Sequence, residues 1–360
     1  MFAGTVEDLK IASRLVKKRG LPVNLIFFVT SVCNLLCRHC FYWEELNKKK
    51  NELSVGEIER IARSLPNLLS VSFTGGEPYL RPDLPDVALA FERNSNARNL
   101  QIPSNGLLVD RTVALLEELL LKVRRSKVST GVSLDGPESV HNRIRQNPKS
   151  FERAVETLAE MKKLKPRFPN LSVGVALTVS AANQDCLDEF YRYVEEELRP
   201  DAVTITLVRG NPIDASLKAV NFDVYREFSR RVIRYRRTYA TANTWRERMV
   251  IAKEEETYRL IGDAAAATRR ICPCYAGELI GILNETGEVF LCETLNRSMG
   301  NVRDFDCDFA RLWSAPAAEE ARTYQKELAC QCTYECAMSV NALFNPLRAA
   351  RIFKNSLVAS

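Results

Sequence analysis

The sequence predicts an α/β fold: a partial (β/α)6 TIM-like barrel, followed by a small C-terminal domain that carries most of the cysteines. Between residues 25 and 210, short apolar runs alternate with amphipathic helical stretches. This pattern is typical of a parallel sheet with helices between its strands. After residue 221 the chain changes to long polar helical stretches, and seven of its 11 cysteines fall between residues 272 and 336.

Six strands and several helices of the barrel can be placed along the chain. Each apolar run is rich in β-branched or aromatic residues and ends in small or polar residues. Six such units with right-handed crossovers could make an open part of a barrel. The predicted strands are residues 25–30, 69–74, 100–103, 128–134, 173–179 and 203–208. Predicted helices between them include residues 55–64, 111–123, 151–163 and 187–198.

The second part of the chain contains two long helices and a hairpin. The helices are predicted at residues 222–239 and 245–261. Apolar runs at 279–284 and 289–291 flank Glu285, Thr286 and Gly287, which favours a β-hairpin. We therefore expect an N-terminal helix or extension (1–22), the barrel (23–220), a helical linker (221–265), the cysteine-bearing domain (266–340) and a tail (341–360).

Composition and cysteine usage narrow the class of protein. A 46% apolar content allows a sizeable core, and the net charge of +6 is compatible with an anionic substrate without requiring nucleic acid. We see no run of about 18 apolar residues and no secretory signal at the start. Clustered cysteines in odd number disfavour a disulfide scaffold and favour metal or redox chemistry in a cytoplasmic protein. Only Cys186 stands alone, and it is interpreted as a small buried apolar residue; Cys307, within the C-terminal group, is interpreted as a packing residue.

Three cysteines follow the first predicted strand at spacings of four and three. A [4Fe–4S] cluster normally takes four cysteine ligands, so Cys33, Cys37 and Cys40 would leave one iron open to another molecule. The alternative is a zinc site with His39 as its fourth ligand. The spacing of the cysteines alone leaves both interpretations open.

The motif of Cys33, Cys37 and Cys40 resembles the signature of the radical S-adenosylmethionine (SAM) superfamily. Three further motifs match at the ends of later strands: Gly-Gly-Glu-Pro at 75–78, Pro-Ser-Asn-Gly at 103–106, and Ser-Leu-Asp-Gly-Pro at 133–137 followed by residues 141–145. The last stretch is similar to the superfamily branch with a C-terminal SPASM or twitch extension. Each motif alone could be a turn or a helix cap. Together they fall at the barrel end that carries active sites.

The resemblance implies that the amino and carboxylate groups of SAM chelate the open iron. Glycines let the backbone approach the SAM amino group. An arginine can bind the SAM carboxylate through charge-assisted bonds. We expect Asp135 to accept from the ribose hydroxyls or to hold its turn, and His141 to bond locally. The predicted SAM-binding residues are Gly75, Gly76, Glu77, Pro78, Ser104, Asn105, Ser133, Asp135 and Arg145.

The C-terminal cysteines resemble the opening and closing parts of a SPASM or twitch extension, although the closing part is short. The predicted hairpin brings Cys274 and Cys292 together. We favour one auxiliary [4Fe–4S] cluster on Cys274, Cys292, Cys332 and Cys336, with Cys272 and Cys330 as spare or alternative ligands. A second, incompletely ligated cluster and a structural zinc site are the alternatives.

Three functional hypotheses follow. In the first, the 5′-deoxyadenosyl radical takes hydrogen from a small sugar- or carbinol-like molecule, and the auxiliary cluster accepts the second electron. In the second, the substrate is a ribosomal peptide; the short segment before the first strand disfavours a fused leader-binding domain. The third is a zinc-stabilised RNA-binding protein. Residues on strands five and six that would face a substrate are Thr178, Ser180, Thr206 and Arg209.

Partner predictions are less specific. The radical chemistry calls for a flavodoxin- or ferredoxin-type reductant. The basic stretch at 230–237 could contact RNA, but nearby acidic residues make a solvated helix face the better interpretation. Apolar and basic residues at 343–354 could contact a membrane surface, although a helix packed on the barrel is favoured.

Overall fold

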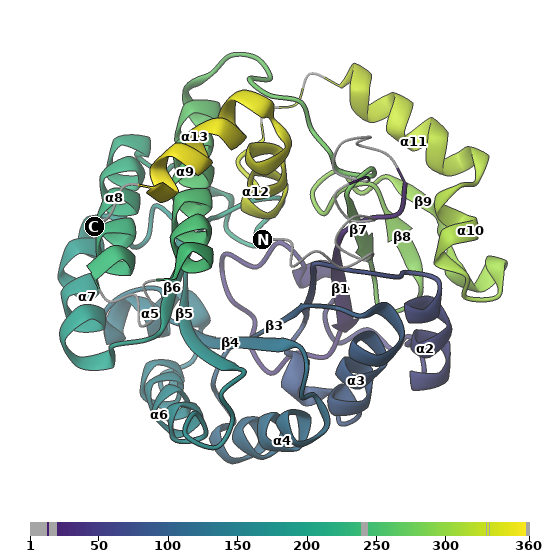
Figure 1. Ribbon diagram of the computed structural model, residues 1–360. Coiled ribbons are helices and arrows are strands. Elements are labelled where there is room, and N and C mark those ends of the chain that lie inside the picture. The colour runs from purple at the N-terminus through teal and green to yellow at the C-terminus, as the bar shows by residue number, and fades with distance from the viewer. Residues whose placement is uncertain (1–12, 14–19, 239–243, 329, 331, 358–360) are drawn as a thin grey trace.

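The computed structural model describes residues 13, 20–238, 244–328, 330 and 332–357. Its centre is one nine-stranded sheet in the order β6-β5-β4-β3-β2-β1-β7-β8-β9. The first six strands run parallel, as predicted, and helices cover their outer side (Figure 1). These strands are β1 (Asn24–Thr30), β2 (Ser70–Gly75), β3 (Asn99–Ser104), β4 (Lys127–Ser133), β5 (Leu171–Val179) and β6 (Ala202–Leu207). The predicted N-terminal helix lies outside the described residues, apart from residue 13 and residues 20–22.

Helices connect the parallel strands. They are α2 (Val55–Arg63), α3 (Leu84–Ser95), α4 (Val109–Lys122), α5 (Glu138–Arg145), α6 (Ser150–Lys163) and α7 (Leu187–Tyr193). Helix α2 shows how the local sequence fixes a boundary: Ser54 and Glu57 form a reciprocal capping box at its first turn. The core between helices and sheet includes Phe27, Phe73 and Phe91, whose ring centroids lie 5.7–6.3 Å apart.

The barrel interior is less filled than the outer layer. Buried and partly exposed residues alternate along β5, so one face packs against helices and the other faces the interior. Thr178 belongs to the partly exposed set and lines a pocket inside the barrel. The open interior at the carboxyl ends of the strands is therefore where ligands can enter.

The predicted hairpin is present, but the sheet continues through it. β7 (Ile280–Leu283) pairs antiparallel with β8 (Glu288–Phe290), which pairs with β9 (Ser298–Asn301). β7 also pairs parallel with β1, which the sequence analysis did not foresee. The C-terminal segment is thus joined to the barrel by main-chain hydrogen bonds, and the domain boundaries stay predictions.

The remaining helices form two groups. α9 (Trp245–Ala266) packs against α8 (Phe222–Thr238), α12 (Glu335–Phe344) and α13 (Pro346–Leu357) (Figure 1). The short α10 (Phe309–Trp313) and α11 (Pro316–Glu327) lie beside β9. Cys307 is buried as predicted, whereas Cys186 is only half-buried, because its thiol lies at the start of α7 and donates to the Asn183 carbonyl oxygen.

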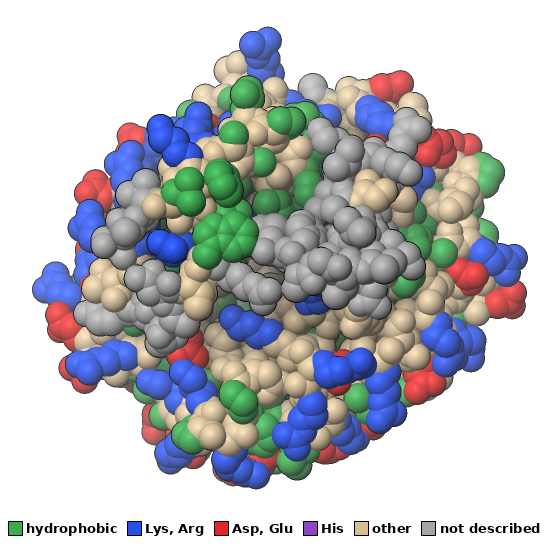
Figure 2. Space-filling model, in the orientation of Figure 1, with side chains coloured by type: hydrophobic (Ala, Val, Ile, Leu, Met, Phe, Trp, Pro, Cys, Tyr) green, Lys and Arg blue, Asp and Glu red, His purple; other side chains and the backbone are tan. Residues whose placement is uncertain are grey.

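The tail helix α13 packs on α9 and α12. The sequence favoured a packed helix here but placed it on the barrel, so the predicted packing surface was wrong, because α9 and α12 supply the apolar partners instead. Helix α13 still leaves three large apolar side chains in solvent: Leu347, Phe353 and Leu357 are 50–83% exposed. Figure 2 shows apolar side chains gathered in this region of the surface. Contact of this helix with a membrane surface stays a prediction. Among the described residues, no helix combines the length and apolar character needed to cross a membrane.

We predict that Gly131→Ala destabilises the barrel. A Cβ at this β4 position would lie 2.4 Å from the Gly174 carbonyl oxygen on β5, so the strands would have to move. Overpacking of this kind costs about 1–3 kcal/mol. Thermal unfolding should show a clearly lower midpoint for this variant. Gly56→Ala in α2 is the matched control, because its Cβ would meet nothing within 4 Å, and its midpoint should be equal or higher. Equal midpoints for both variants would contradict the prediction.

Candidate active site

A pocket at the carboxyl ends of the parallel strands brings together four segments that are far apart in the sequence. The Cys33–Cys37–Cys40 loop forms one side, and the turns after β2, β3 and β4 form another. Of the predicted SAM-binding residues, the pocket is lined by Gly75, Gly76, Glu77, Pro78, Ser104, Asn105, Ser133 and Arg145. Asp135 is the one predicted SAM-binding residue that does not line this pocket.

The cysteine loop is held by its own backbone and by one asparagine. The Asn47 side chain accepts from the Cys33 amide at 2.9 Å and donates to the Cys33 carbonyl oxygen at 3.0 Å. Glu52 accepts from the Thr30 hydroxyl and the Ser31 amide at the exit of β1. These contacts fix the direction in which the loop leaves the sheet.

Without a bound metal centre, the three thiols ionise poorly. Burial raises the pKa of Cys33 to about 12 and that of Cys40 to about 11, and burial also raises the pKa of Cys37. A thiolate is the form that binds metal, so a bound cationic centre would have to supply the energy of ionisation. The donor set of three buried, grouped thiols fits an iron–sulfur cluster with one open iron.

The zinc alternative requires thiolates about 2.3 Å from one ion. Among the described residues, no three His, Cys, Asp or Glu side chains form such a group. His39 lines the same pocket, its Nδ1 is buried without a hydrogen-bond partner, and burial lowers its pKa to about 4.

The glycines after β2 bring the backbone against the cysteine loop. A Cβ on Gly76 would lie 2.1 Å from the Val32 carbonyl oxygen, and Gly75 has a φ of +111°. The amides of Gly76 and Glu77 donate to the carbonyl oxygens of Thr30 and Val32 at 2.9 and 2.8 Å. In this structure the glycines therefore serve loop packing, and their approach to the SAM amino group stays a prediction.

Glu77 is a buried carboxyl group on the pocket wall. It accepts from the Asn105 amide at 2.7 Å and from the Tyr79 amide at 3.2 Å. Burial raises its pKa to about 7, while these hydrogen bonds oppose that rise. The Asn105 side chain in turn donates to the Asn34 Oδ1 at 2.7 Å, which ties β3 to the cysteine loop. A ligand amino group would give Glu77 a cationic partner.

Asp135 lies beneath the pocket and acts on Arg145. Its Oδ2 accepts from Arg145 Nε at 2.7 Å, and its Oδ1 accepts from the Thr178 amide at 3.0 Å. The Asp135 side chain is fully buried and does not line the pocket. This geometry supports the turn-holding alternative and gives no support to a contact with ribose. Its amide donates to His141 Nδ1 at 3.1 Å, in line with the local role expected for that histidine.

Arg145 points at the cysteine loop as well as into the pocket. Its Nη1 lies 3.7 Å from Cys37 Sγ, so its charge faces a predicted cluster ligand. The Asp135 carboxylate holds the pKa of Arg145 above its ordinary value despite burial. Arg145 can thus offset negative charge on Cys37 and present a guanidinium to an anionic ligand. The second role, binding the SAM carboxylate, stays a prediction.

The predicted substrate-facing residues are only partly confirmed. Thr178, Thr206 and Arg209 line the pocket, and the two threonine hydroxyls lie 3.2 Å apart. The prediction that Ser180 faces the substrate was wrong. Ser180 is fully buried, its amide donates to Asn183 Oδ1, and it does not line the pocket. β5 ends at Val179, so Ser180 lies in the turn after the strand, where alternation along the strand no longer sets the direction of the side chain.

The C-terminal cysteines gather at a second place. Cys272, Cys274, Cys330 and Cys332 line one small cavity. Burial raises the pKa of Cys332, and the neighbouring thiols of Cys274, Cys292 and Cys330 raise it further. Of the four favoured ligands, Cys274 and Cys332 line this cavity, and Cys292 and Cys336 do not. Both predicted spares, Cys272 and Cys330, line it as well. The grouping and burial of these thiols fit a second iron–sulfur cluster.

Several residues that position the site were missed by the sequence analysis. Glu285, at the β7–β8 turn, is fully buried and accepts from Lys50 Nζ at 2.5 Å and from the Tyr42 hydroxyl at 2.6 Å. It connects the cysteine loop to the C-terminal hairpin. Asn47 was missed as well, although its positive φ of 58° is typical of asparagine in a turn. The sequence carried no signal for the Glu285 contact, because its partners lie 235–243 residues away.

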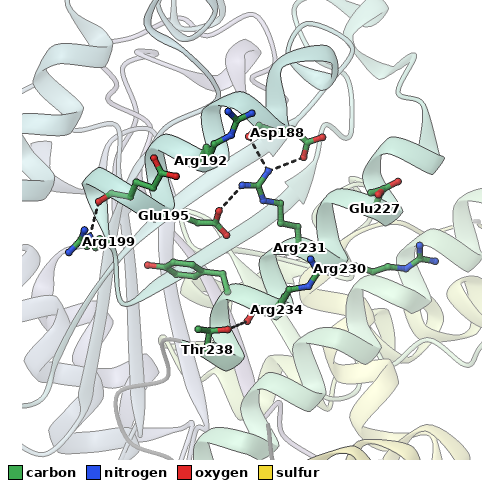
Figure 3. A pocket seen from close by; sticks show the side chains of 11 residues that line it. Asp188, Arg192, Glu195, Arg199, Glu227, Arg230, Arg231, Arg234 and Thr238 are labelled. Atoms are coloured by element: carbon green, nitrogen blue, oxygen red, sulfur yellow. Dashed lines mark hydrogen bonds and ion pairs between the residues drawn. The ribbon is translucent and has the colours of Figure 1, made fainter.

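The basic stretch on α8 is largely paired with acids. Arg231 bonds Asp188 and Glu195 in a surface groove between α7 and α8 (Figure 3). Arg236 and Arg237 form ion pairs with Glu254 and Glu255, respectively. These pairs reduce the positive potential that RNA binding would use, in line with the favoured interpretation of a solvated helix face.

We predict that Asn47→Ala weakens cluster binding without unfolding the protein. The variant loses two hydrogen bonds to the Cys33 backbone, each worth about 1 kcal/mol. After anaerobic reconstitution with iron and sulfide, it should hold less iron per chain and bleach faster in air. Asn51→Ala is the control, since this neighbouring side chain is exposed. Equal iron content and equal bleaching in the two variants would contradict the assigned role of Asn47.

Comparisons with known proteins identify the family of the barrel domain. Residues 27–194 match the family model of the Radical SAM superfamily. The chain is 30% identical over 249 residues to Fe-coproporphyrin III synthase of Methanosarcina barkeri, which covers 65% of this chain and 58% of that protein. It is also 30% identical over 194 residues to the cysteine-type anaerobic sulfatase-maturating enzyme of Clostridium perfringens. This alignment covers 49% of this chain and 49% of that protein. The chain thus spans less than two thirds of both relatives.

Solved structures share the fold. The crystal structure of Streptococcus suis SuiB bound to S-adenosylmethionine superposes with a TM-score of 0.61 at 19% identity, covering 88% of this chain and 73% of that one. Native anSMEcpe with bound AdoMet superposes with a TM-score of 0.59 at 17% identity. This superposition covers 93% of this chain and 96% of that one. The predicted partial barrel with a C-terminal extension is confirmed by this likeness. Residues 27–194 form a domain of the radical SAM superfamily, and this matched domain contains the cysteine loop and the motifs after β2, β3 and β4.

Proposed function

We propose that this radical SAM enzyme removes a hydrogen atom from a small sugar- or carbinol-like substrate and oxidises it with the help of an auxiliary cluster. The observation that carries the proposal is the arrangement of two cysteine groups around one barrel opening. The first group lines the pocket, and the second comes from segments on both sides of the β7–β8 hairpin, whose strand β7 pairs with β1. When bound, the cluster and SAM supply one-electron cleavage of SAM to methionine and a 5′-deoxyadenosyl radical.

The chain's own residues have distinct parts in this chemistry. Cys33, Cys37 and Cys40 would hold three irons and leave the fourth for SAM. Glu77 offers a carboxylate to the SAM amino group, and Arg145 offers a guanidinium to its carboxylate. The burial of both side chains keeps water away from these contacts and strengthens them.

The wall near β5 and β6 supports a hydroxyl-bearing substrate. Thr178 and Thr206 present two hydroxyl groups 3.2 Å apart, which can donate to and accept from neighbouring hydroxyls of a substrate. Oxidation of a carbinol then balances as follows. The carbon would lose a hydrogen atom to the 5′-deoxyadenosyl radical, the hydroxyl proton would leave to solvent, and the auxiliary cluster, when bound, would accept the remaining electron. A flavodoxin- or ferredoxin-type protein would supply the electron that cleaves SAM.

A peptide substrate is the second candidate. It is supported by the similarity to a relative whose name states that it matures a sulfatase, and that similarity covers 49% of this chain. Deuterium transfer separates the two candidates, because only the true substrate delivers its label into 5′-deoxyadenosine.

We predict that Cys33→Ala abolishes SAM cleavage. With dithionite and SAM under anaerobic conditions, the wild-type protein should form 5′-deoxyadenosine and the variant should form none above background. Cys186→Ala is the matched control, because this cysteine lines neither cysteine-bearing cavity, and it should keep full activity. Retention of SAM cleavage by the Cys33 variant would show that the site assignment is wrong.

We predict that Cys292→Ala separates the two clusters. Loss of the auxiliary cluster should lower the iron content from about eight to about four atoms per chain. The variant should still form 5′-deoxyadenosine, while oxidised product disappears. An unchanged iron content in this variant would contradict an auxiliary cluster on the C-terminal cysteines.

A further inference from the structure

One arginine contacts residues that neighbour both cysteine groups. Arg209 follows β6 and lines the SAM pocket. Its guanidinium lies over the ring of Phe41 at 5.0 Å and over the ring of Tyr334 at 4.6 Å. Phe41 directly follows Cys40 in the first group, and Tyr334 lies two residues before Cys336 in the second. Arg209 is therefore positioned between the two predicted cluster sites.

Two buried carboxylates complete the surroundings of Arg209. Its Nη1 donates to Glu335 Oε1 at 2.9 Å, and its Nη2 lies 3.2 Å from Glu293 Oε2. Glu293 directly follows Cys292, and Glu335 directly precedes Cys336. The Glu293 and Glu335 side chains are 3% and 13% exposed, respectively, so solvent screens these charges little. The guanidinium thus fixes both loops that carry auxiliary cysteines.

Such a charge has two physical consequences. The planar fork of an arginine holds two carboxylates in a defined geometry, which sets where the cysteine loops lie. A permanent positive charge near an iron–sulfur cluster also favours its reduced, more negative form, because net charge and burial are among the factors that set cluster potentials. The carboxylates act in the opposite direction.

We propose that Arg209 is a positioning residue that holds the auxiliary cysteine loops against the SAM pocket and raises the reduction potential of the cluster they bind. The proposal rests on the proposed function. A higher potential makes the auxiliary cluster a better acceptor for the single electron that the substrate radical gives up as it becomes a carbonyl and loses its proton.

The test uses the full chain with both clusters, reconstituted anaerobically. Arg209→Met removes the charge, and Glu293→Gln removes an opposing one. The matched control is Arg231→Met. Arg231 also bonds two carboxylates and lies 5.2 Å over a tyrosine ring, but it lies in the surface groove of Figure 3, which includes none of the cysteines.

The readout is the midpoint potential of the auxiliary cluster. It is followed by electron paramagnetic resonance during a redox titration, using the signal that added SAM leaves unchanged. Arg209→Met should shift this potential downward, Glu293→Gln should shift it upward, and Arg231→Met should leave it at the wild-type value. Arg209→Lys keeps the charge without the fork and should lie between wild type and Arg209→Met.

Two results would overturn the proposal: no shift in fully loaded Arg209→Met, or shifts of the same sign in Arg209→Met and Glu293→Gln. If Arg209→Met fails to load iron, Glu293→Gln decides, and an unshifted potential there counts against Arg209. A wild-type protein that holds only one cluster per chain contradicts the proposed function itself. The iron count reveals that outcome before any variant is compared.

Discussion

Strand β1 and its two parallel neighbours determine where the rest of the site lies. β1 pairs with β2 on one side and with β7 on the other, in register over several residues. The cysteine loop leaves the carboxyl end of β1. It therefore lies between the motif after β2 and the turn that joins β7 to β8. Because hydrogen bonds between strands tolerate little sliding, these three segments cannot move independently. The contact of the β7–β8 turn, through Glu285, with Tyr42 and Lys50 after the cysteine loop is thus a consequence of sheet order.

Charge is the second constraint on this region. Burial opposes ionisation of the thiols, yet the thiolate is the form that binds a cluster. The chain places cations where the cysteine loops need them: Arg145 near Cys37 and Arg209 beside the neighbours of Cys40 and Cys336. Each arginine is itself fixed by a buried carboxylate. The positive charge that offsets the thiolates therefore lies on residues that neighbour the cysteine ligands.

The parts of this molecule that depend on local pattern were predictable. Alternating strands and helices indicated the barrel, and a strand end followed by glycine and polar residues indicated each wall of the pocket. What the sequence could not show were contacts made by side chains from distant segments. Asp135 fits the same motif whether it faces a ligand or a buried arginine, and Ser180 fits the same pattern whether the strand ends before or after it. The pairing of β7 with β1 was hidden because a short strand has the same pattern in any sheet.

The barrel and the extension are joined by different kinds of interaction. The β1–β7 pairing relies on the main chain, whereas the cysteine loops are joined through ion pairs such as Lys50–Glu285 and Arg209–Glu335. Breaking one partner of a buried pair leaves an uncompensated charge, which costs about 3–5 kcal/mol. Single substitutions at these pairs therefore act on the relative placement of the loops while the sheet remains. The placement of the cysteine loops is thus sensitive to residues, such as Lys50 and Glu285, that do not line the pocket.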